Sequence, residues 1–501
     1  MNYTAAGRWA ALDAKRTGLI TRCERYAELT LPHVCPKDGY DEGSQEASGD
    51  YQSVGAQATN NLVNKMMLAM FAPSRPFMRF ELNPIQKGII LDALGVSEAE
   101  FREESSVAEK DAIKLLDSLA IRPKLFDLFQ HLIITGNCVR YMDGDATRIL
   151  GIKDYVVRRN NKGEMVELLI REKTAVEDLP EEVQQFAGKR NPDDDVWYYR
   201  WWRKRGKLYH ETQYIEDTLI AHKKYVGRYL PKDMPVQAHT WNLPDKRNYG
   251  VGHVEHSIGD LEAMSMLSEA ELNGAILASE FRWLINPGGQ TNVSDFKVTA
   301  NGDALPGVSG DMELVSAGPV AAAVQMVGSI NEKYVRRIGA AFLLTAGVQR
   351  DAERVTAEEI RLLANELETG LGGIYSRLAV DLQLPLAYWL MNKTGGGIFK
   401  DTDFEPVIVT GLDALSRNGD LENTQLFIQD VIQITSMPPE VLAYLKVDAI
   451  FSDLAAGRGL RGSQYVRSEA EVQQQQQKAQ QKLQEQQTDM MAQEAALKGN
   501  K

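Results

Sequence analysis

Two histidines with acidic neighbours are the residues of this chain whose types and spacing best suit a metal site. His253 and His256 are three positions apart, with Glu255 between them and Asp260 following. Side chains at positions i and i+3 share one face of a helix, so the two imidazoles can bind one ion. The competing interpretation is a polar first turn of a helix without metal. We favour that interpretation and expect no metal site.

Motifs for nucleotide hydrolysis and nucleophilic catalysis are absent. The sequence has no GxxxxGK[ST], and neither Gly188-Lys189 nor Gly206-Lys207 is followed by Ser or Thr. A phosphate-binding loop needs that spacing to surround the phosphates. There is also no GxSxG and no HExxH. We therefore expect no catalytic residue, no cofactor and no ATP hydrolysis by this chain.

A run rich in aromatic and basic residues, Trp197-Tyr-Tyr-Arg-Trp-Trp-Arg-Lys-Arg205, has two interpretations. Its rings and cations can stack on bases and bind phosphates. Alternatively, strand alternation buries every second aromatic residue, and the run is an edge strand of a sheet. We favour the edge strand.

Length, charge and cysteine content limit the class of protein. A chain of 501 residues predicts two to four domains. A formal net charge of −13 disfavours a protein that grips DNA by neutralising its phosphates, but not one that lets DNA slide. Cys23, Cys35 and Cys138 show no CxxC spacing, which predicts free buried thiols and a reducing cytoplasm. No long apolar run and no signal peptide are present, so no membrane insertion is expected.

The N-terminal half predicts helices followed by a sheet. Residues 1–80 resemble two helices around a polar loop, and residues 98–136 have helical periodicity. From 140 to 239, short β-prone runs predict an antiparallel sheet with a turn at Gly163 and a helical interruption near residues 179–186.

Two helices that flank a small lobe are expected next along the chain. Apolar residues recur every three or four positions in 253–281 and again in 319–343. Residues 285–318 lack that period and are rich in Gly, Val, Thr and Asp, which predicts a lobe that contains β-structure. The helices can pack antiparallel and carry the lobe at their tip.

A long amphipathic helix is expected over residues 357–391. Thr356 and Glu359 form a capping box at its start, and an apolar stripe continues through Leu371 and Leu378 to Leu386. Pro385 is expected to kink the helix near its end. Further on, residues 466–497 are Gln-rich with sparse apolar positions, which fits either a partly frayed tail or a helix that bundles with its own copies.

Motifs along most of the chain resemble one protein family, the head-to-tail connector or portal proteins of short-tailed phages. The resemblance fades beyond about residue 421. The motifs are Val348-Gln-Arg350, Glu353-Arg-Val-Thr-Ala-Glu-Glu-Ile360, Glu366-Leu-Glu368, Leu371-Gly-Gly-Ile-Tyr375, Leu382-Gln-Leu-Pro-Leu386, Asp50-Tyr-Gln52, Val54-Gly-Ala56, Asn61-Leu62, Lys65-Met-Met-Leu-Ala-Met-Phe71, Tyr155-Val-Val-Arg158, Tyr249-Gly250, Asp260-Leu261, Ile285-Asn-Pro287 and Thr410-Gly-Leu412.

The resemblance implies a mostly α-helical, ring-forming portal fold with an α+β wing. It assigns the parts as follows: wing 1–252, first stem helix 253–284, clip 285–318, second stem helix 319–343, tunnel loop 344–355, long kinked wing helix and following strand 356–430, and crown with the Gln-rich helix 431–501.

The resemblance also implies a function. Twelve copies would form a passive ring at one capsid vertex of the virion, assembled in the host cytoplasm. Its partners would be double-stranded viral DNA, bound non-specifically, the terminase, the tail adaptor and tail proteins, and the capsid with scaffolding or internal core proteins. The alternatives are a tail adaptor or internal-core ring that does not dock terminase, and a metal-dependent hydrolase that uses the two histidines.

Candidate site residues follow from these parts. Gln349, Arg350 and Arg354 in the tunnel loop, with Arg336 and Arg337 at the end of the second stem helix, are expected to touch passing DNA. For each arginine an intra- or intersubunit salt bridge is an open alternative, since Asp351, Glu353 and Glu359 are near in sequence. The clip residues expected to meet terminase or tail are Asn286, Gln290, Asp295, Lys297, Asp303 and Asp311.

Overall fold

The computed structural model describes residues 4–38, 50–72, 77–81, 98–279, 281–289, 294, 308–316, 318–344, 357–394, 405–408, 429 and 432. The chain divides into two compact units, Met1–Gly411 and Leu412–Lys501. All elements described below belong to the first unit. Apart from Ile432, the expected crown and Gln-rich helix lie outside the described residues.

Helices of the N-terminal half build the largest core. The helices predicted before and after the polar loop are present, the first of them divided in two, whereas residues 39–49 of the loop lie outside the described residues. The helical stretch 98–136 is two helices separated at Ala120, whose φ is 50°. The elements are α1 (Ala5–Asp13), α2 (Thr17–Glu28), η1 (Pro32–Val34), α3 (Val54–Met70), α5 (Glu98–Ser118) and α6 (Ile121–Thr135). Leu62, Met66 and Leu128 are fully buried in this core, so the methionines fill it as apolar side chains.

Two antiparallel sheets follow, where the alternating runs predicted one. The smaller has the order β10-β2-β3, and the larger has the path β4-β5-β6-β7-β8, with β9 also paired to β7. Gly163, at φ 81°, makes the expected turn between β4 and β5, and the expected helical interruption is α7 (Glu181–Gln184). The strands are β2 (Asn137–Asp143), β3 (Ala146–Leu150), β4 (Tyr155–Arg159), β5 (Met165–Ala175), β6 (Asp195–Arg205), β7 (Leu208–Ile215), β8 (Thr218–Leu219), β9 (Arg228–Tyr229) and β10 (Val236–Thr240).

The expectation that the aromatic run 197–205 is an edge strand is wrong. This run is β6, and it pairs with β5 on one side and β7 on the other. Tyr199 and Trp201 pack against α1, whereas Trp202 packs against residues of the smaller sheet on the opposite face. Because both faces of β6 are covered, neighbouring aromatic residues are buried together, and Tyr198 is buried as well.

Charged and aromatic contacts fasten α1 to this sheet. Arg8 donates from Nε and Nη2 to Glu167 on β5, at 2.9 and 2.6 Å. The guanidinium of Arg171 lies 4.3 Å from the ring centroids of both Trp9 and Trp197. These contacts bring α1 onto a strand about 160 residues further along the chain.

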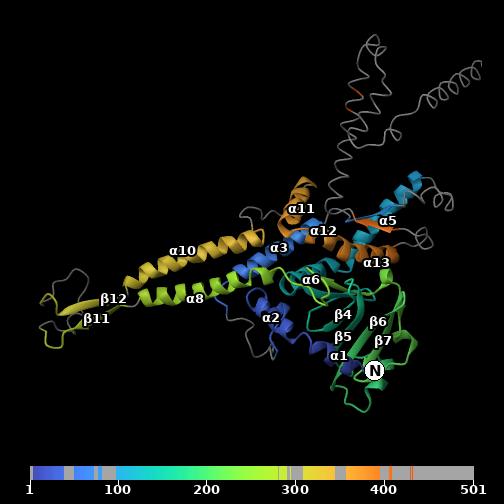
Figure 1. Cartoon of the computed structure of the whole chain (residues 1–501), viewed down its shortest axis with the longest axis horizontal. Helices are drawn as coiled ribbons and strands as arrows, with labels where there is room; N and C mark the ends of the chain where they lie inside the picture. Colours follow the sequence, from blue (N-terminus) through green and yellow to red (C-terminus); the bar gives the residue numbers. More distant parts are fainter. Residues whose placement is uncertain are drawn as a thin grey trace, which may run out of the picture. The chain divides into compact units, whose positions relative to one another are not determined.

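The helix, lobe, helix pattern is also present, with one boundary corrected. The first helix, α8 (Ile258–Ser279), follows a 3₁₀ turn, η5 (Val254–His256), and ends before Phe281. The expected helical residues 281–284 are instead in β11 (Phe281–Ile285), which pairs with β12 (Met312–Ser316). Phe, Trp and Ile favour a strand when a partner strand is available. The second helix is α10 (Gly318–Ala341), and Figure 1 shows α8 and α10 side by side with the two strands at one end.

The single long helix expected at 357–391 is wrong. The segment contains α11 (Ala357–Leu371), α12 (Ile374–Leu378), a π-helix η7 (Ala379–Gln383) and α13 (Leu384–Thr394). Gly372 and Gly373 adopt φ of 61° and 84°, which ends the first helix. The distortion expected at Pro385 appears as the π-helix, because proline lacks the N–H that would bond to the carbonyl of Asp381.

The strand expected after the long helix and the expected free cysteines are both present. β1 (Met78–Glu81) pairs antiparallel with β13 (Glu405–Ile408), the strand expected after the long helix. Cys23, Cys35 and Cys138 are buried free thiols, as predicted. Thr356 of the capping box lies outside the described residues. Within the part of the chain that the structure describes, no helix is both long and apolar enough to cross a lipid bilayer.

Candidate functional site: the α8–α10 helix pair and its hairpin

Small residues let α8 and α10 approach closely. A Cβ added to Gly274 would lie 2.7 Å from Cγ2 of Val324, and one added to Gly328 would lie 3.0 Å from Oε1 of Glu271. Real side chains do not tolerate the first of these distances, so Gly274 is required where the helices cross. Asn331 of α10 then donates from Nδ2 to Ser268 Oγ at 3.1 Å and to Glu271 Oε2 at 3.3 Å. The pair is therefore a specifically packed antiparallel hairpin.

Two arginines near the C-terminal end of α10 form ion pairs within the chain. Arg337 lies 3.0 Å from Asp260 of α8, and Arg336 lies 3.1 Å from Glu332 one turn earlier. Their side chains remain 64% and 78% exposed, and exposed pairs of this kind contribute only about 0–1 kcal/mol. Pairing therefore leaves both guanidinium groups accessible to another anion, and their contact with DNA stays a prediction.

His253 anchors the base of the pair. Its Nε2 lies 2.9 Å from the carbonyl oxygen of Ala341, and its ring packs edge-on against Phe342 at a centroid distance of 4.8 Å. Burial lowers the pKa of His253, so the ring is neutral at neutral pH. Asn61 of α3 donates to the carbonyl oxygens of Phe342 and Leu343. The described residues contain no group of three or more His, Cys, Asp or Glu side chains arranged to hold a metal.

Large apolar side chains are exposed along both helices. Met266 on α8 is 71% exposed and Met326 on α10 is 64% exposed. Leu272, Ile276 and Leu277 on α8 are also exposed. Apolar groups gathered on one element beyond what its own fold buries mark a surface for association with another protein.

The two strands at the tip are held by a regular ladder. Ile285 pairs with Met312, and the backbone N–H of Asn286 donates to the carbonyl oxygen of Asp311 at 2.9 Å. The Asn286 side chain accepts from the N–H of Gly288 at 3.1 Å, and a Cβ on Gly289 would collide with the Asp311 carboxyl. Asn286 and Asp311, two of the predicted docking residues, thus close the base of the loop at the tip.

The structure brings together only part of the predicted site. Arg336, Arg337, Asn286 and Asp311 lie on the helix pair or its hairpin. The other predicted residues lie outside the described residues: Gln349, Arg350, Arg354, Gln290, Asp295, Lys297 and Asp303.

Sequence reasoning missed the residues that hold the pair in register. Asp260 was considered as a metal neighbour and as part of a family motif, yet it is the partner of Arg337. Gly274 and Asn331 were not singled out, because neither breaks the apolar period of its helix. Aligning the two expected helices as an antiparallel hairpin would have placed Asp260 opposite Arg337.

A family model and individual relatives match this chain over most of its length. Residues 2–465 match the family model for bacteriophage head to tail connecting protein. The portal protein of Enterobacteria phage SP6 is 32% identical over 429 residues, which cover 84% of this chain and 82% of that protein. The portal protein of Pseudomonas phage phiKMV is 30% identical over 503 residues, covering 95% of each. The portal protein of Escherichia phage T7 is 29% identical, covering 83% and 79%.

A solved structure is also similar. A chain in the neck of an empty GTA particle matches with a TM-score of 0.39 and 12% identity, over 82% of this chain and 90% of that chain.

Proposed function

This chain belongs to the family of bacteriophage head to tail connecting proteins and has their portal function, and we propose how its elements perform it. The family is structural rather than enzymatic, and its members are components of the virion. In our proposal, identical copies close into a ring at one capsid vertex. Viral DNA passes through the ring during packaging and again during ejection.

The observation that supports the ring is the apolar surface of the helix pair. Met266, Ile276 and Met326 are exposed in a single copy, although the same helices pack tightly against each other. A head-to-tail contact between identical copies would cover these side chains on every copy. Repetition of such a contact produces a closed ring when the rotation from one copy to the next is a whole fraction of a full turn. We propose twelve copies, with α8 and α10 lining the channel.

The net charge of the protein is compatible with a channel through which DNA slides without being held. Each copy carries a formal net charge of −13, so a ring of such copies is negative as a whole and would not bind the phosphates of the duplex tightly. Arg350 and Arg354 of the proposed tunnel loop, with Arg336 and Arg337, would supply local and transient phosphate contacts.

The β11–β12 hairpin is proposed as the docking end. It lies at the tip of the helix pair, at the other end from the contacts by which His253 and Asn61 hold the end of α10. Terminase would bind here during packaging, and tail proteins would follow. Capsid and scaffolding or internal core proteins would contact the ring elsewhere.

Imaging and mass measurement of the purified full-length protein test the ring. We expect a closed ring with a central hole wide enough for a DNA duplex, and a mass that gives the number of copies. A monomer under assembly conditions would refute the proposal. A ring that binds tail proteins but never terminase would instead identify an adaptor.

The tunnel loop has its own test. We expect Arg350→Ala with Arg354→Ala to leave ring assembly intact and to reduce the DNA packaged per particle, because phosphate contacts in the channel are lost. Lys189→Ala with Lys207→Ala, which removes two exposed cations outside the proposed channel, is the matched control. Normal packaging by the loop variant would remove the loop from the mechanism.

A further inference from the structure

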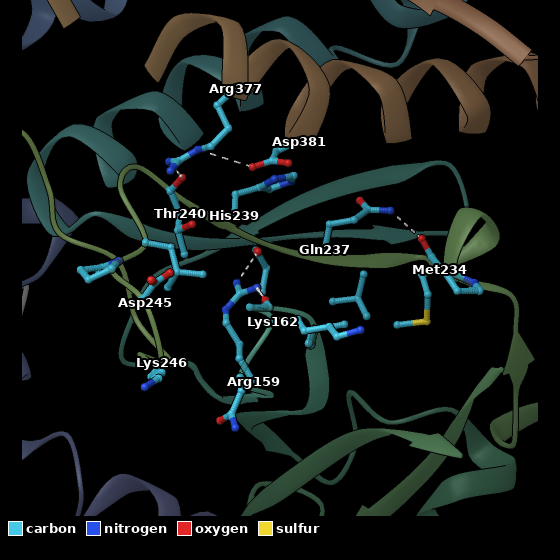
Figure 2. Close-up of a pocket in the computed structure, with 18 of the residues that line it drawn as sticks. Arg159, Lys162, Met234, Gln237, His239, Thr240, Asp245, Lys246, Arg377 and Asp381 are labelled. Carbon is cyan, nitrogen blue, oxygen red and sulfur yellow. Dashed lines mark hydrogen bonds and ion pairs between the residues drawn. The ribbon is translucent and has the colours of Figure 1, made fainter. Parts of the chain in front are cut away.

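A cavity of about 530 Å³ lies in the first unit, at a place that the connector function does not use. Its walls are the edge of β10, the turn after β4, the loop at residues 243–246 and the α12–η7 segment (Figure 2). We propose that this cavity binds an oxyanion, namely a phosphate group that is either free or carried by a small phosphomonoester. The proposal is independent of the ring, because it rests only on residues within one copy.

Positive charge predominates in the cavity. Its lining contains four cationic side chains, Arg159, Lys162, Lys246 and Arg377, against two carboxylates, those of Asp245 and Asp381. An excess of two positive charges in one concave site is notable because the whole chain carries −13. A cavity concentrates the field of its charges, so the local potential attracts anions although the protein as a whole repels them.

Arg159 is held in place without a carboxylate. Its guanidinium donates to three backbone carbonyl oxygens, those of Gly163 at 3.0 Å, Ala238 at 2.8 Å and Asn248 at 3.2 Å. These neutral acceptors fix the group without supplying a counter-charge in direct contact. Burial lowers the pKa of Arg159, as expected when a cation lacks a close anion. Five N–H groups minus three bonds leave two donors for a ligand.

Arg377 also lines the cavity and is incompletely paired (Figure 2). Its Nη2 donates to the carbonyl oxygens of Thr240 and Trp241. Its Nε has no hydrogen-bond partner, and the carboxylate of Asp381 is 3.7 Å away. Burial raises the pKa of Asp381, so its negative charge is itself disfavoured in this place.

The back wall adds one polar group that the fold leaves unsatisfied. His239 is 3% exposed and lines the cavity, and its Nε2 has no hydrogen-bond partner. Burial and the nearby cations of Arg140 and Arg159 hold the pKa of His239 well below its usual value. A hydrogen bond to the backbone of Asp381 opposes this shift only in part, so the ring is neutral. Arg140 is fully buried and does not itself line the cavity; it supports the wall by donating to Gln237, a lining residue. A buried polar atom without a partner is costly unless a ligand or a water molecule satisfies it.

Two lysines complete the site from the solvent side. Lys162 and Lys246 are exposed and line the cavity, and in the part of the chain described here neither ammonium group forms an ion pair. No hydrogen bond that the fold requires depends on either side chain. They are therefore the residues to change when the charge of the cavity is tested without disturbing its walls.

Binding of inorganic phosphate and of a nucleoside monophosphate to the purified full-length protein tests the proposal by calorimetry. We expect saturable binding at one site per chain with a Kd of about 1 mM or tighter, and competition between the two ligands. Lys162→Gln with Lys246→Gln should weaken both by about tenfold, because two of the four cations lose their charge. Lys189→Gln with Lys207→Gln removes the same charge elsewhere and should leave binding unchanged.

The two sources are distinguished by relative affinity. Tighter binding of the nucleoside monophosphate indicates a phosphomonoester, and equal binding indicates free phosphate. Absence of saturable binding, or equal weakening by the control pair, would overturn the proposal. So would binding of duplex DNA or of an acidic peptide at this site while both small ligands fail.

Discussion

The guanidinium of Arg337, close to the end of α10, lies 3.0 Å from the carboxylate of Asp260 in the first turn of α8. The two residues join the start of α8 to the end of α10, at the end of the hairpin away from β11 and β12. The ring of Tyr334 lies 5.5 Å from the same guanidinium. Arg337 is thus positioned by its own chain while its side chain remains mostly exposed.

The pair itself should contribute little to stability, and Arg337 should matter for DNA. We expect Asp260→Asn and Arg337→Gln each to lower the free energy of unfolding by no more than about 1 kcal/mol, because the pair is exposed. Only Arg337→Gln should reduce the DNA packaged per particle. Thermal melts and packaging assays measure the two effects. Equal packaging loss in both variants would show that the ion pair alone is needed.

Close packing of the helix pair depends on Gly274. We predict that Gly274→Ala destabilises the protein by about 1–3 kcal/mol, since its Cβ would overlap the side chain of Val324. Gly328→Ala is the matched control, because the flexible Glu271 side chain that it meets can move aside. Chemical denaturation of both variants gives the difference. Equal stability would mean that the helices separate without cost.

The loop at the tip can be removed while its strands are kept. A variant that lacks residues 287–310 and carries Asp311→Gly joins Ile285 to Met312 through an Asn-Gly loop, which favours a two-residue hairpin. We expect rings to form and terminase or tail attachment to be lost. Sedimentation and pull-down experiments measure these properties. Normal attachment would place docking outside the loop.

Acidification should destabilise the protein partly through His131. Burial lowers the pKa of His131 to about 4, and its Nδ1 has no hydrogen-bond partner. An unfolded chain protonates histidine near its usual pKa of about 6.5. Between these values the unfolded state binds more protons, so stability is present above pH 6.5 and falls as the pH drops towards 4.

The variant His131→Phe should flatten that dependence. Tm measured from pH 7 to pH 4 should decline less steeply in His131→Phe than in the original protein, and His210→Phe on β7 serves as the control. Parallel curves for His131→Phe and the original protein would assign the acid sensitivity to other groups.

Local periodicity was sufficient for much of the fold. The apolar spacing of α8 and α10 and the alternation of β4 to β7 depend on neighbours within a few residues, which a sequence displays directly. The break at Gly372-Gly373 was missed because the apolar stripe continues across it in phase. The sequence did contain a signal for this break, because two consecutive glycines strongly disfavour a helix.

The sequence by itself determined the order of elements, the family and the acidic character of this protein. Tertiary structure decided that β6 is an interior strand, because α1 covers one face of it from about 190 residues away. Tertiary structure also paired Arg337 with Asp260 and gathered Arg159, His239 and Arg377 around one cavity. Burial and uncompensated charge arise from residues distant along the chain, so no local pattern carries them.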